Sequence, residues 1–595
     1  MYQYTDFDKQ FVKLRAEQHR DQLERNLAGT LSDEDFRPLR LQNGWYIQRH
    51  APMLRVAVPY GELSAKQMRA MATIARDFDV PDAEVQAKIK EEPSLGGFGG
   101  LAAGVAHFTT RQNVQFNWIP LVKSADVMDL LATVNMHGIQ TSGNCIRNIT
   151  SDERAGVAHD EIADPRPFCE ILRQWSTLHP EFAFLPRKFK IAVTGAVEDR
   201  AATAWHDVGL YLIKNAAGEL GFRVLVGGGM GRTPVIGTEI RAFLPWNQIM
   251  NYLEAVVRVY NRFGRRDNIY KARIKILVKA EGQKYIDEVE AEYQLILQQD
   301  GAPHTITQEE LARVTASFVP PAGINIAAPA TKSVAVENAS EIKEYARWLQ
   351  QNVALHKNPA LRCVTLSFKR LGSAPGDATP RELETAAELA DHFSAGEVRV
   401  TPDQNLLLPW VRLDDLPDLY QAARAAGFAR ANVRLLTDMI ACPGGDFCAL
   451  ANARSLPISA AITERYQDMD ELFDLGEIDL HISGCINSCG HHHSGHIGIL
   501  GVDKDGKEWY QITLAGSDGS HLSGGATPGK VIGPSFSADE VPDVIEAVLD
   551  TYRAARLPNE AFIDTLKRVG LDSFKAAAKD ARHPAPALEE ETAAA

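Results

Sequence analysis

Four cysteines in two close pairs constrain the fold of this chain more than any other feature. Cys442 and Cys448 are separated by five residues, thirty-six residues follow, and Cys485 and Cys489 are separated by three. Glycine or proline adjoins each pair, so the backbone can turn sharply around a compact centre. Four thiolates that converge from two loops suit a cubane iron–sulfur cluster, because each iron takes one soft sulfur ligand.

A zinc site and disulfides are the alternatives for these cysteines. Structural zinc sites usually space their paired ligands by about two to four residues, and the first pair here is more open than that. Disulfides require an oxidising compartment. The first ten residues, MYQYTDFDKQ, contain neither the basic nor the apolar segment of an export signal, and the cysteine total is odd. We therefore expect reduced thiols and a cytoplasmic location.

The segments around both pairs resemble the cluster motifs of the siroheme-dependent sulfite and nitrite reductases, most closely the assimilatory sulfite reductase haemoprotein. They read TDMIACPGGDFCALANARS at 437–455 and HISGCINSCGHHHSGHIGILG at 481–501. The resemblance implies that the four cysteines hold a [4Fe-4S] cluster and that Cys489 also provides the axial thiolate of siroheme iron. A shared sulfur would let electrons pass from the cluster to the haem through bonds.

Composition limits the partners of the chain. Its 595 residues are 45% hydrophobic, enough for two to four domains, and the net charge of −14 argues against nucleic acid or an anionic membrane surface as partner. No apolar run approaches the roughly 20 residues that span a bilayer. The glycine-rich loop at 222–234 lacks the dinucleotide pattern G-x-G-x-x-G, because Arg232 replaces the last glycine. Electrons must therefore come from a separate donor protein, a ferredoxin or a flavoprotein subunit.

The sequence contains a weak internal repeat. Gln112-Asn113 and Trp118 recur as Gln404-Asn405 and Trp410 at a constant offset of 292. A predicted strand and helix precede each copy, which favours a duplicated half. We predict an α+β fold of two pseudo-symmetric halves, each with a ferredoxin-like repeat domain and an α/β domain that binds siroheme or the cluster. A cofactor would lie at their junction.

The pattern divides the chain into seven segments. The predicted segments are an N-terminal helical arm (1–50), the first ferredoxin-like half-repeat (51–138), the first siroheme- and substrate-binding domain (139–317), a linker (318–338), the second half-repeat (339–435), the cluster domain (436–578) and a disordered tail (579–595). Gly29 is expected to end the helix of the arm, and Asp505-Gly506 predicts a β-hairpin. Residues 79–104 are expected to form a surface insertion or flap.

Four cations are candidates for binding an anionic substrate. Lys188 and Lys190 would share one face of a predicted strand at 187–193, where two like charges are unfavourable unless an anion lies between them. An isolated Arg or Lys is usually a solvated surface charge. The resemblance implies that Arg55, Arg147, Lys188 and Lys190 are catalytic residues that surround the substrate and deliver protons.

The resemblance also implies residues that hold siroheme. Arg111 would pair with its carboxylates, a task that suits a bidentate guanidinium, and the backbone of a glycine-rich loop would approach the macrocycle. The implied cofactor-binding residues are Arg111, Gln115, Gly228, Gly229, Arg232 and Cys489. A basic run at 261–279 resembles a family segment near siroheme, or else forms a helix with a solvated face. His491, His492 and His493 stay without an assigned role.

Lys190 distinguishes the candidate substrates. Nitrite reductases that resemble this chain commonly have asparagine there, whereas sulfite reductases have K-x-K. We expect six-electron reduction of sulfite to sulfide, with reduction of nitrite to ammonia as the alternative. A zinc-bound scaffold without redox activity is a more distant alternative.

Overall fold

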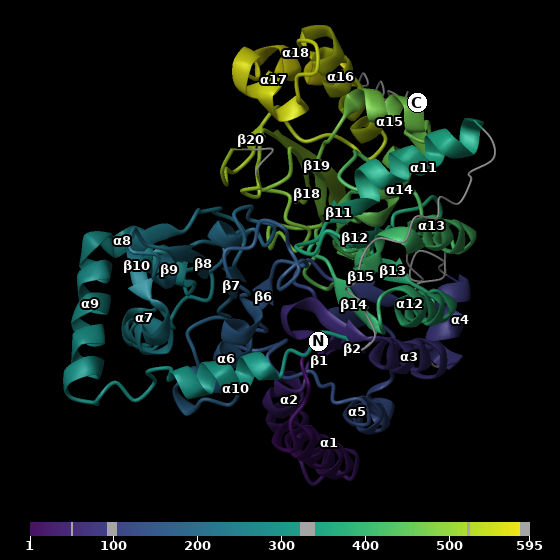
Figure 1. Cartoon of the computed structure of the whole chain (residues 1–595). Coiled ribbons are helices and arrows are strands. Elements are labelled where there is room, and N and C mark those ends of the chain that lie inside the picture. The colour runs from purple at the N-terminus through teal and green to yellow at the C-terminus, as the bar shows by residue number, and fades with distance from the viewer. Residues whose placement is uncertain (49–51, 82, 92–103, 322–338, 521–523, 583–595) are drawn as a thin grey trace, which may run out of the picture.

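The computed structural model describes residues 1–48, 52–81, 83–91, 104–321, 339–520 and 524–582. These residues form four five-stranded sheets with helices packed on them (Figure 1). The α+β fold predicted from the sequence is confirmed. None of the helices in these ranges combines the length and apolarity needed to cross a membrane.

Two of the sheets interlock at the centre of the molecule. Their strand orders are β1-β2-β5-β4-β13 and β11-β12-β15-β14-β3. β3 of the first half pairs with β14 of the second half, and β13 of the second pairs with β4 of the first, so each half lends one strand to the other. The strands are β1 (Trp45–Ile47), β2 (Pro52–Val56), β3 (Glu62–Ser64), β4 (Ala106–Phe108), β5 (Val114–Phe116), β11 (Val353–Leu355), β12 (Leu361–Leu366), β13 (Asp377–Ala378), β14 (Glu397–Val400) and β15 (Leu406–Arg412).

The helices on these sheets bury one shared apolar core that draws on both halves. Ser64 caps its helix with a reciprocal capping box, because its hydroxyl accepts the Gln67 N–H and the Gln67 side chain accepts the Ser64 N–H. Thr379 does the same in the second half. The helices are α3 (Ala65–Thr73), which a π-helical turn (Ile74–Phe78) continues, α5 (Ser124–Ala132), α11 (Ala339–Asn352), α12 (Pro380–Phe393) and α13 (Leu416–Ala425).

The repeat seen in the sequence is a structural pseudo-twofold. Gln112 and Gln404 both adopt a positive φ, 59° and 61°, in matching turns. The Gln112 amide donates to the carbonyl of Val400 at 3.2 Å, and the Gln404 amide donates to the carbonyl of Phe108 at 2.9 Å. Phe108 and Val400 are themselves 292 positions apart. The two bonds are therefore symmetric partners that join the halves.

Truncating this symmetric contact should destabilise the protein. Gln404 is buried, and its amide also exchanges two hydrogen bonds with Ala441, at 2.9 and 3.0 Å. Gln404→Ala leaves these backbone groups unpaired, so we expect the free energy of unfolding to fall by about 2–4 kcal/mol. Denaturant-induced unfolding measures the change. Gln421→Ala, at an exposed position of α13, is the matched control and should change stability by under about 0.5 kcal/mol. Equal unfolding midpoints for the two variants would refute the expectation.

The other two sheets form the α/β domains. Their orders are β10-β9-β8-β7-β6 and β16-β17-β18-β19-β20. In each sheet the three strands that come first along the chain, β6 to β8 and β16 to β18, are parallel, and an antiparallel hairpin follows. The predicted hairpin turn at Asp505-Gly506 is confirmed, with positive φ at both residues. The strands are β6 (Thr150–Ser151), β7 (Ile191–Thr194), β8 (Val208–Lys214), β9 (Leu220–Val226), β10 (Thr238–Pro245), β16 (Ile440–Ala441), β17 (Leu480–Ser483), β18 (Ile497–Lys504), β19 (Lys507–Leu514) and β20 (Lys530–Val531).

Each α/β domain has its own helices and core and forms a separate lobe in Figure 1. The helices of the first domain are α6 (Arg166–Ser176), α7 (Ile249–Phe263), α8 (Ile274–Glu281), α9 (Gln283–Gln298) and α10 (Gln308–Ala316). Those of the second are α14 (Leu456–Arg465), α15 (Met469–Leu475), α16 (Glu540–Ala555), α17 (Phe562–Val569) and α18 (Asp572–Asp580).

Several local expectations differ from the structure. The arm contains two helices, α1 (Asp6–Leu27) and α2 (Asp33–Gln42), and then strand β1, so it is not helical throughout. The first copy of the repeat, around Gln112, contains two strands, β4 and β5, because Gln112 takes a left-handed conformation that turns the chain between them. The strand expected at 187–193 begins only at Ile191.

Some predicted segments lie partly outside the described residues. α4 (Ala83–Glu91) lies within the expected insertion, and 92–103 are outside the description. Of the expected linker, 322–338 are outside, whereas Phe318 pairs with Tyr2 in a β-bridge. α18 reaches Asp580, and 583–595 of the expected tail are outside.

Candidate functional site

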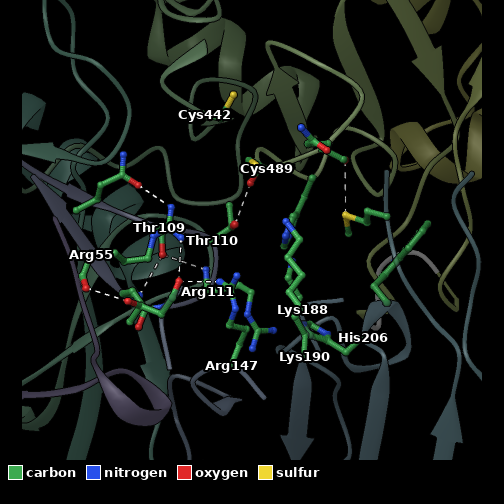
Figure 2. Close-up of a pocket in the computed structure, with 18 of the residues that line it drawn as sticks. Arg55, Thr109, Thr110, Arg111, Arg147, Lys188, Lys190, His206, Cys442 and Cys489 are labelled. Atoms are coloured by element: carbon green, nitrogen blue, oxygen red, sulfur yellow. Dashed lines mark hydrogen bonds between the residues drawn. The ribbon is translucent and has the colours of Figure 1, made fainter. Parts of the chain in front are cut away.

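A cavity lies at the junction of the two halves. Its described lining includes six cationic side chains and no carboxylate, although the chain carries a net charge of −14. The cations are Arg55, Arg111, Arg147, Lys188, Lys190 and Arg273. Figure 2 shows five of them below Cys442 and Cys489, reaching toward the same space. This concentration of positive charge is a local basic pocket in an acidic molecule.

Arg55 and Arg147 lie beside each other. Arg55 projects from β2 and donates to the carbonyl oxygen of Thr141 at 3.2 Å and to Gln115 Oε1 at 3.0 Å. Arg147, in the segment before β6, donates to the same Thr141 oxygen at 2.7 Å and to Gly143 O at 2.8 Å. Neutral carbonyls orient both guanidinium groups without neutralising them, so their charge stays available to an anion.

Lys188 and Lys190 reach the cavity from the segment that precedes β7. The ammonium group of neither lysine has a hydrogen-bond partner among the described residues. Burial lowers the pKa of Lys188 to about 8. The pKa of Lys190 is well below its usual value, first because of burial and then because of Arg111 and Lys188. An anion between these groups would offset that repulsion and favour their charged forms.

Arg111 lies in the turn between β4 and β5. Its Nη2 donates to the carbonyl of Asn148 at 2.7 Å, whereas Nη1 is buried and has no partner. Burial lowers the pKa of Arg111 to about 9. An orphaned guanidinium N–H beside a cavity without carboxylates suits a ligand that brings its own carboxylates.

The structure brings Cys442, Cys448 and Cys485 within electrostatic reach of Cys489. Cys442 and Cys489 line the cavity. Burial raises the pKa of Cys442 to about 12, and the charge of Cys489 adds to this rise. The pKa values of Cys448 and Cys485 are also raised, mainly by burial and further by Cys489. Buried thiolates like these are stable when cationic iron binds them.

The turns around the cysteines require glycine. A Cβ on Gly490 would lie 1.9 Å from the carbonyl oxygen of Ile482. The Gly484 N–H donates to Cys442 Sγ at 3.2 Å, and such a bond favours a thiolate. The Thr110 hydroxyl of the first half donates to the Cys489 carbonyl at 3.0 Å, which ties the two halves together at this point.

The glycine-rich loop meets the cavity through a residue that the sequence did not single out. Met230 lines the cavity, whereas Gly228, Gly229 and Arg232 do not. A Cβ on Gly228 would lie 2.4 Å from the carbonyl oxygens of Ala204 and His206, so this glycine permits close backbone packing. Gly229 pairs with Val235 in a β-bridge, and Arg232 is exposed.

Sequence reasoning missed several residues of the cavity. Arg273 lies in the basic run at 261–279 and forms a bidentate ion pair with the buried Asp207, at 2.7 and 2.8 Å. The charge of that run was the signal that could have identified it. His206 carried no such signal, because an isolated histidine is common in cores. The remaining missed lining residues are His107, Thr109, Thr110, Asn113, Gln140, Thr141, Trp205, Met230, Gln404, Pro443, Asn487, Ser488 and His491.

Comparison with protein families identifies this architecture. Residues 142–295 and 433–584, together more than half of the chain, match the model of the nitrite and sulphite reductase 4Fe-4S domain. Residues 366–426 match the nitrite/sulfite reductase ferredoxin-like half domain. The chain belongs to the nitrite and sulfite reductase family. The cofactors of this siroheme-dependent family are a [4Fe-4S] cluster and siroheme, and the cationic cavity beside the cysteines fits both.

The proteins similar to this chain include both nitrite reductases and sulfite reductases by name. The chain is 26% identical over 540 residues to the assimilatory ferredoxin-dependent nitrite reductase of Haloferax mediterranei, covering 88% of this chain and 82% of the relative. It is 26% identical to sulfite reductase [ferredoxin] 1 of Mycolicibacterium paratuberculosis, covering 86% and 81%. The structure of the Mycobacterium tuberculosis NirA protein matches with a TM-score of 0.71 at 23% identity, covering 93% of this chain and 94% of that one. That likeness concerns the fold.

Proposed function

We propose that this family member reduces sulfite to sulfide by six electrons. The observation that carries the proposal is the cavity with six cations and no carboxylate, in which Lys188 and Lys190 stand two residues apart beside Cys489. A small dianion gains more from such a set of cations than a monoanion does. The pairing of Lys188 with Lys190 therefore favours sulfite over nitrite.

The cofactor ligands are part of this proposal. Cys442, Cys448, Cys485 and Cys489 would hold the cluster, and Cys489 would also bind the siroheme iron. Arg111 and Gln115 would contact siroheme, with the loop around Gly228, Gly229 and Arg232 behind it. When bound, siroheme and the cluster supply an iron that takes the anion and a route for electrons to reach it.

The protein side chains would position the substrate and supply protons. Arg55 and Arg147 are held by carbonyl oxygens, so they can offer N–H groups to an oxyanion without losing charge to a carboxylate. Lys188 and Lys190 have low pKa values because of burial, so each gives up a proton readily when oxygen leaves as water. Binding of the next anion would favour reprotonation of both.

Turnover of sulfite and nitrite with one reduced donor tests the proposal. With the same reduced viologen dye and equal substrate concentrations, we expect faster turnover of sulfite. Faster turnover of nitrite would instead favour its reduction to ammonia. Visible absorption, iron and acid-labile sulfide in the purified protein test for the cofactors. A colourless protein with zinc and no iron would support the non-redox scaffold.

We further propose a ferredoxin as the electron donor, since the names of both relatives above include one. Exposed apolar side chains flank the cysteine pairs, at Leu450 after Cys448 and at Ile486 after Cys485, and offer a docking surface beside the cluster. Turnover with reduced ferredoxin, compared with a flavoprotein reductase, tests the choice. A cytoplasmic location and the seven-segment division stay predictions.

A further inference from the structure

A second cavity lies across the junction from the first. Thr110, His206 and His491 line both cavities and form the wall between them. The turn at 109–113 lines the first cavity, and the matching turn at 401–405 lines the second. The pseudo-twofold therefore produces two cavities, and their linings differ.

The cations of the first cavity are absent from the second at equivalent positions. Asp403 corresponds to Arg111 at the offset of 292. Asp479 corresponds to Lys190, because the carbonyl of each accepts a hydrogen bond from the first residue of the next parallel strand, Ile497 or Val208. Thr365 corresponds to Arg55, because Arg55 pairs with Gln115 and Thr365 pairs with Leu407, and these two partners are themselves 292 positions apart. All three replacements line the second cavity.

The cluster cysteines are likewise absent from the first half. The loop from β17 to β18 and the loop from β7 to β8 have equal length, which makes Arg200 the equivalent of Cys489. Asp152 follows β6 as Cys442 follows β16. Asp152 and Arg200 form a buried ion pair at 2.8 Å. Two charged side chains thus occupy the positions of two iron ligands.

The remaining arginines of the second cavity lie next to carboxylates. Arg200 also pairs with Asp160 and Glu198 at 2.7 Å, and Arg434 lies 3.5 Å from Glu198 and from Glu477. Arg154 lies 3.5 Å from Glu153. The carboxylates that line this cavity are Glu153, Glu198, Asp403, Asp479 and Asp518. They outnumber its three arginines, so the net charge of the lining is negative.

The field in the second cavity opposes further negative charge. Asp403 is exposed and lines this cavity together with Asp479, so both carboxylates face the same space. In the first cavity the opposite sign prevails, since Arg111 and Lys188 lower the pKa of Lys190. A molecule that brings several carboxylates would meet attraction in one cavity and repulsion in the other.

We propose that Asp403 and Asp479 exclude carboxylated tetrapyrroles from the second cavity, so that each chain binds one such cofactor although it has two symmetry-related cavities. The inference rests on the proposed function, because it takes siroheme as the occupant of the first cavity. These two aspartates are specificity-determining residues, because their negative charge prevents a second copy of the cofactor from binding.

Titration of the purified holoenzyme with uroporphyrin, a fluorescent, metal-free tetrapyrrole with carboxylates, tests the proposal. Binding is measured by quenching of the uroporphyrin fluorescence. We expect the wild type to bind no equivalent beyond its own siroheme. The variant Asp403→Arg/Asp479→Lys should bind one equivalent per chain at least about 100-fold more tightly than the wild type, since two charges are reversed. Asp403→Asn, which has nearly the same shape, should show a gain of about 10-fold.

Glu24→Arg/Glu464→Lys is the matched control, because it makes the same change in net charge at exposed positions on α1 and α14. It should bind no more uroporphyrin than the wild type. Equal binding by the control and by both Asp403 variants, or one equivalent bound to the wild type, would overturn the proposal. Siroheme extracted from the wild type reports separately on the proposed function, which fails if the purified protein contains none.

Discussion

Replacing Cys489 by alanine is expected to abolish turnover, with a loss of at least about 1,000-fold. If its sulfur is held by both the cluster and the siroheme iron, its removal breaks the only bonded route between them and deprives each of a ligand. We therefore expect the variant to lose siroheme on purification and to contain less acid-labile sulfide. Visible absorption, extracted siroheme and sulfide content measure these losses independently of turnover.

Cys363→Ala separates the loss of a ligand from the general cost of removing a thiol. Cys363 is fully buried in a small core with Val157 and Leu407 and does not line the cavity. Its replacement should lower stability by about 1–2 kcal/mol and leave both cofactors in place. Should Cys489→Ala retain the spectrum and turnover of the wild type, the assignment of Cys489 as a shared ligand would be wrong.

Lys190→Asn should change the preference between substrates. Removing one buried cation is expected to weaken productive binding of sulfite, largely a dianion at pH 8, by about 2–3 kcal/mol, which is roughly 30–150-fold in kcat/KM. Nitrite carries one charge, so its kcat/KM should fall by only about 5–12-fold. The ratio of the two values, measured with one reduced donor, is the decisive quantity.

Lys123→Asn is the control variant for Lys190→Asn. Lys123→Asn removes a charge from an exposed position before α5 and should leave both kcat/KM values unchanged. Siroheme content should be equal in all three proteins, because Lys190 is proposed to face the substrate. An equal fall for sulfite and nitrite would show that Lys190 does not discriminate between them.

The sequence predicted the site where local spacing and chemistry coincide. Two cysteine pairs with glycine at the turns have few uses, and the offset that relates Gln112 to Gln404 corresponds to a real pair of symmetric hydrogen bonds. Lys188 and Lys190 meet the same cavity as Arg55, although they precede β7 and do not lie within a strand.

Other features were beyond the reach of sequence because they depend on tertiary pairing. His206 reaches the cavity only because β7, β8 and the cluster loop assemble around it. Gly228 was expected to contact a macrocycle. A glycine at this position also allows close packing against two carbonyl oxygens, and sequence alone does not distinguish the two roles. The division of β4 from β5 follows from one left-handed residue, which an alternating apolar pattern does not reveal.

The exchange of β3 and β13 has a consequence for biosynthesis. His107 of β4 contacts Asp377 of β13 at 2.7 Å, although the two residues are 270 positions apart in the sequence. When only the first half has been synthesised, the edge of its sheet at β4 lacks the partner strand β13. An unpaired edge of this kind can pair with strands of other chains. Neither half can be expressed alone with its sheet complete, and the edge at β4 stays without its partner strand until translation has passed residue 378.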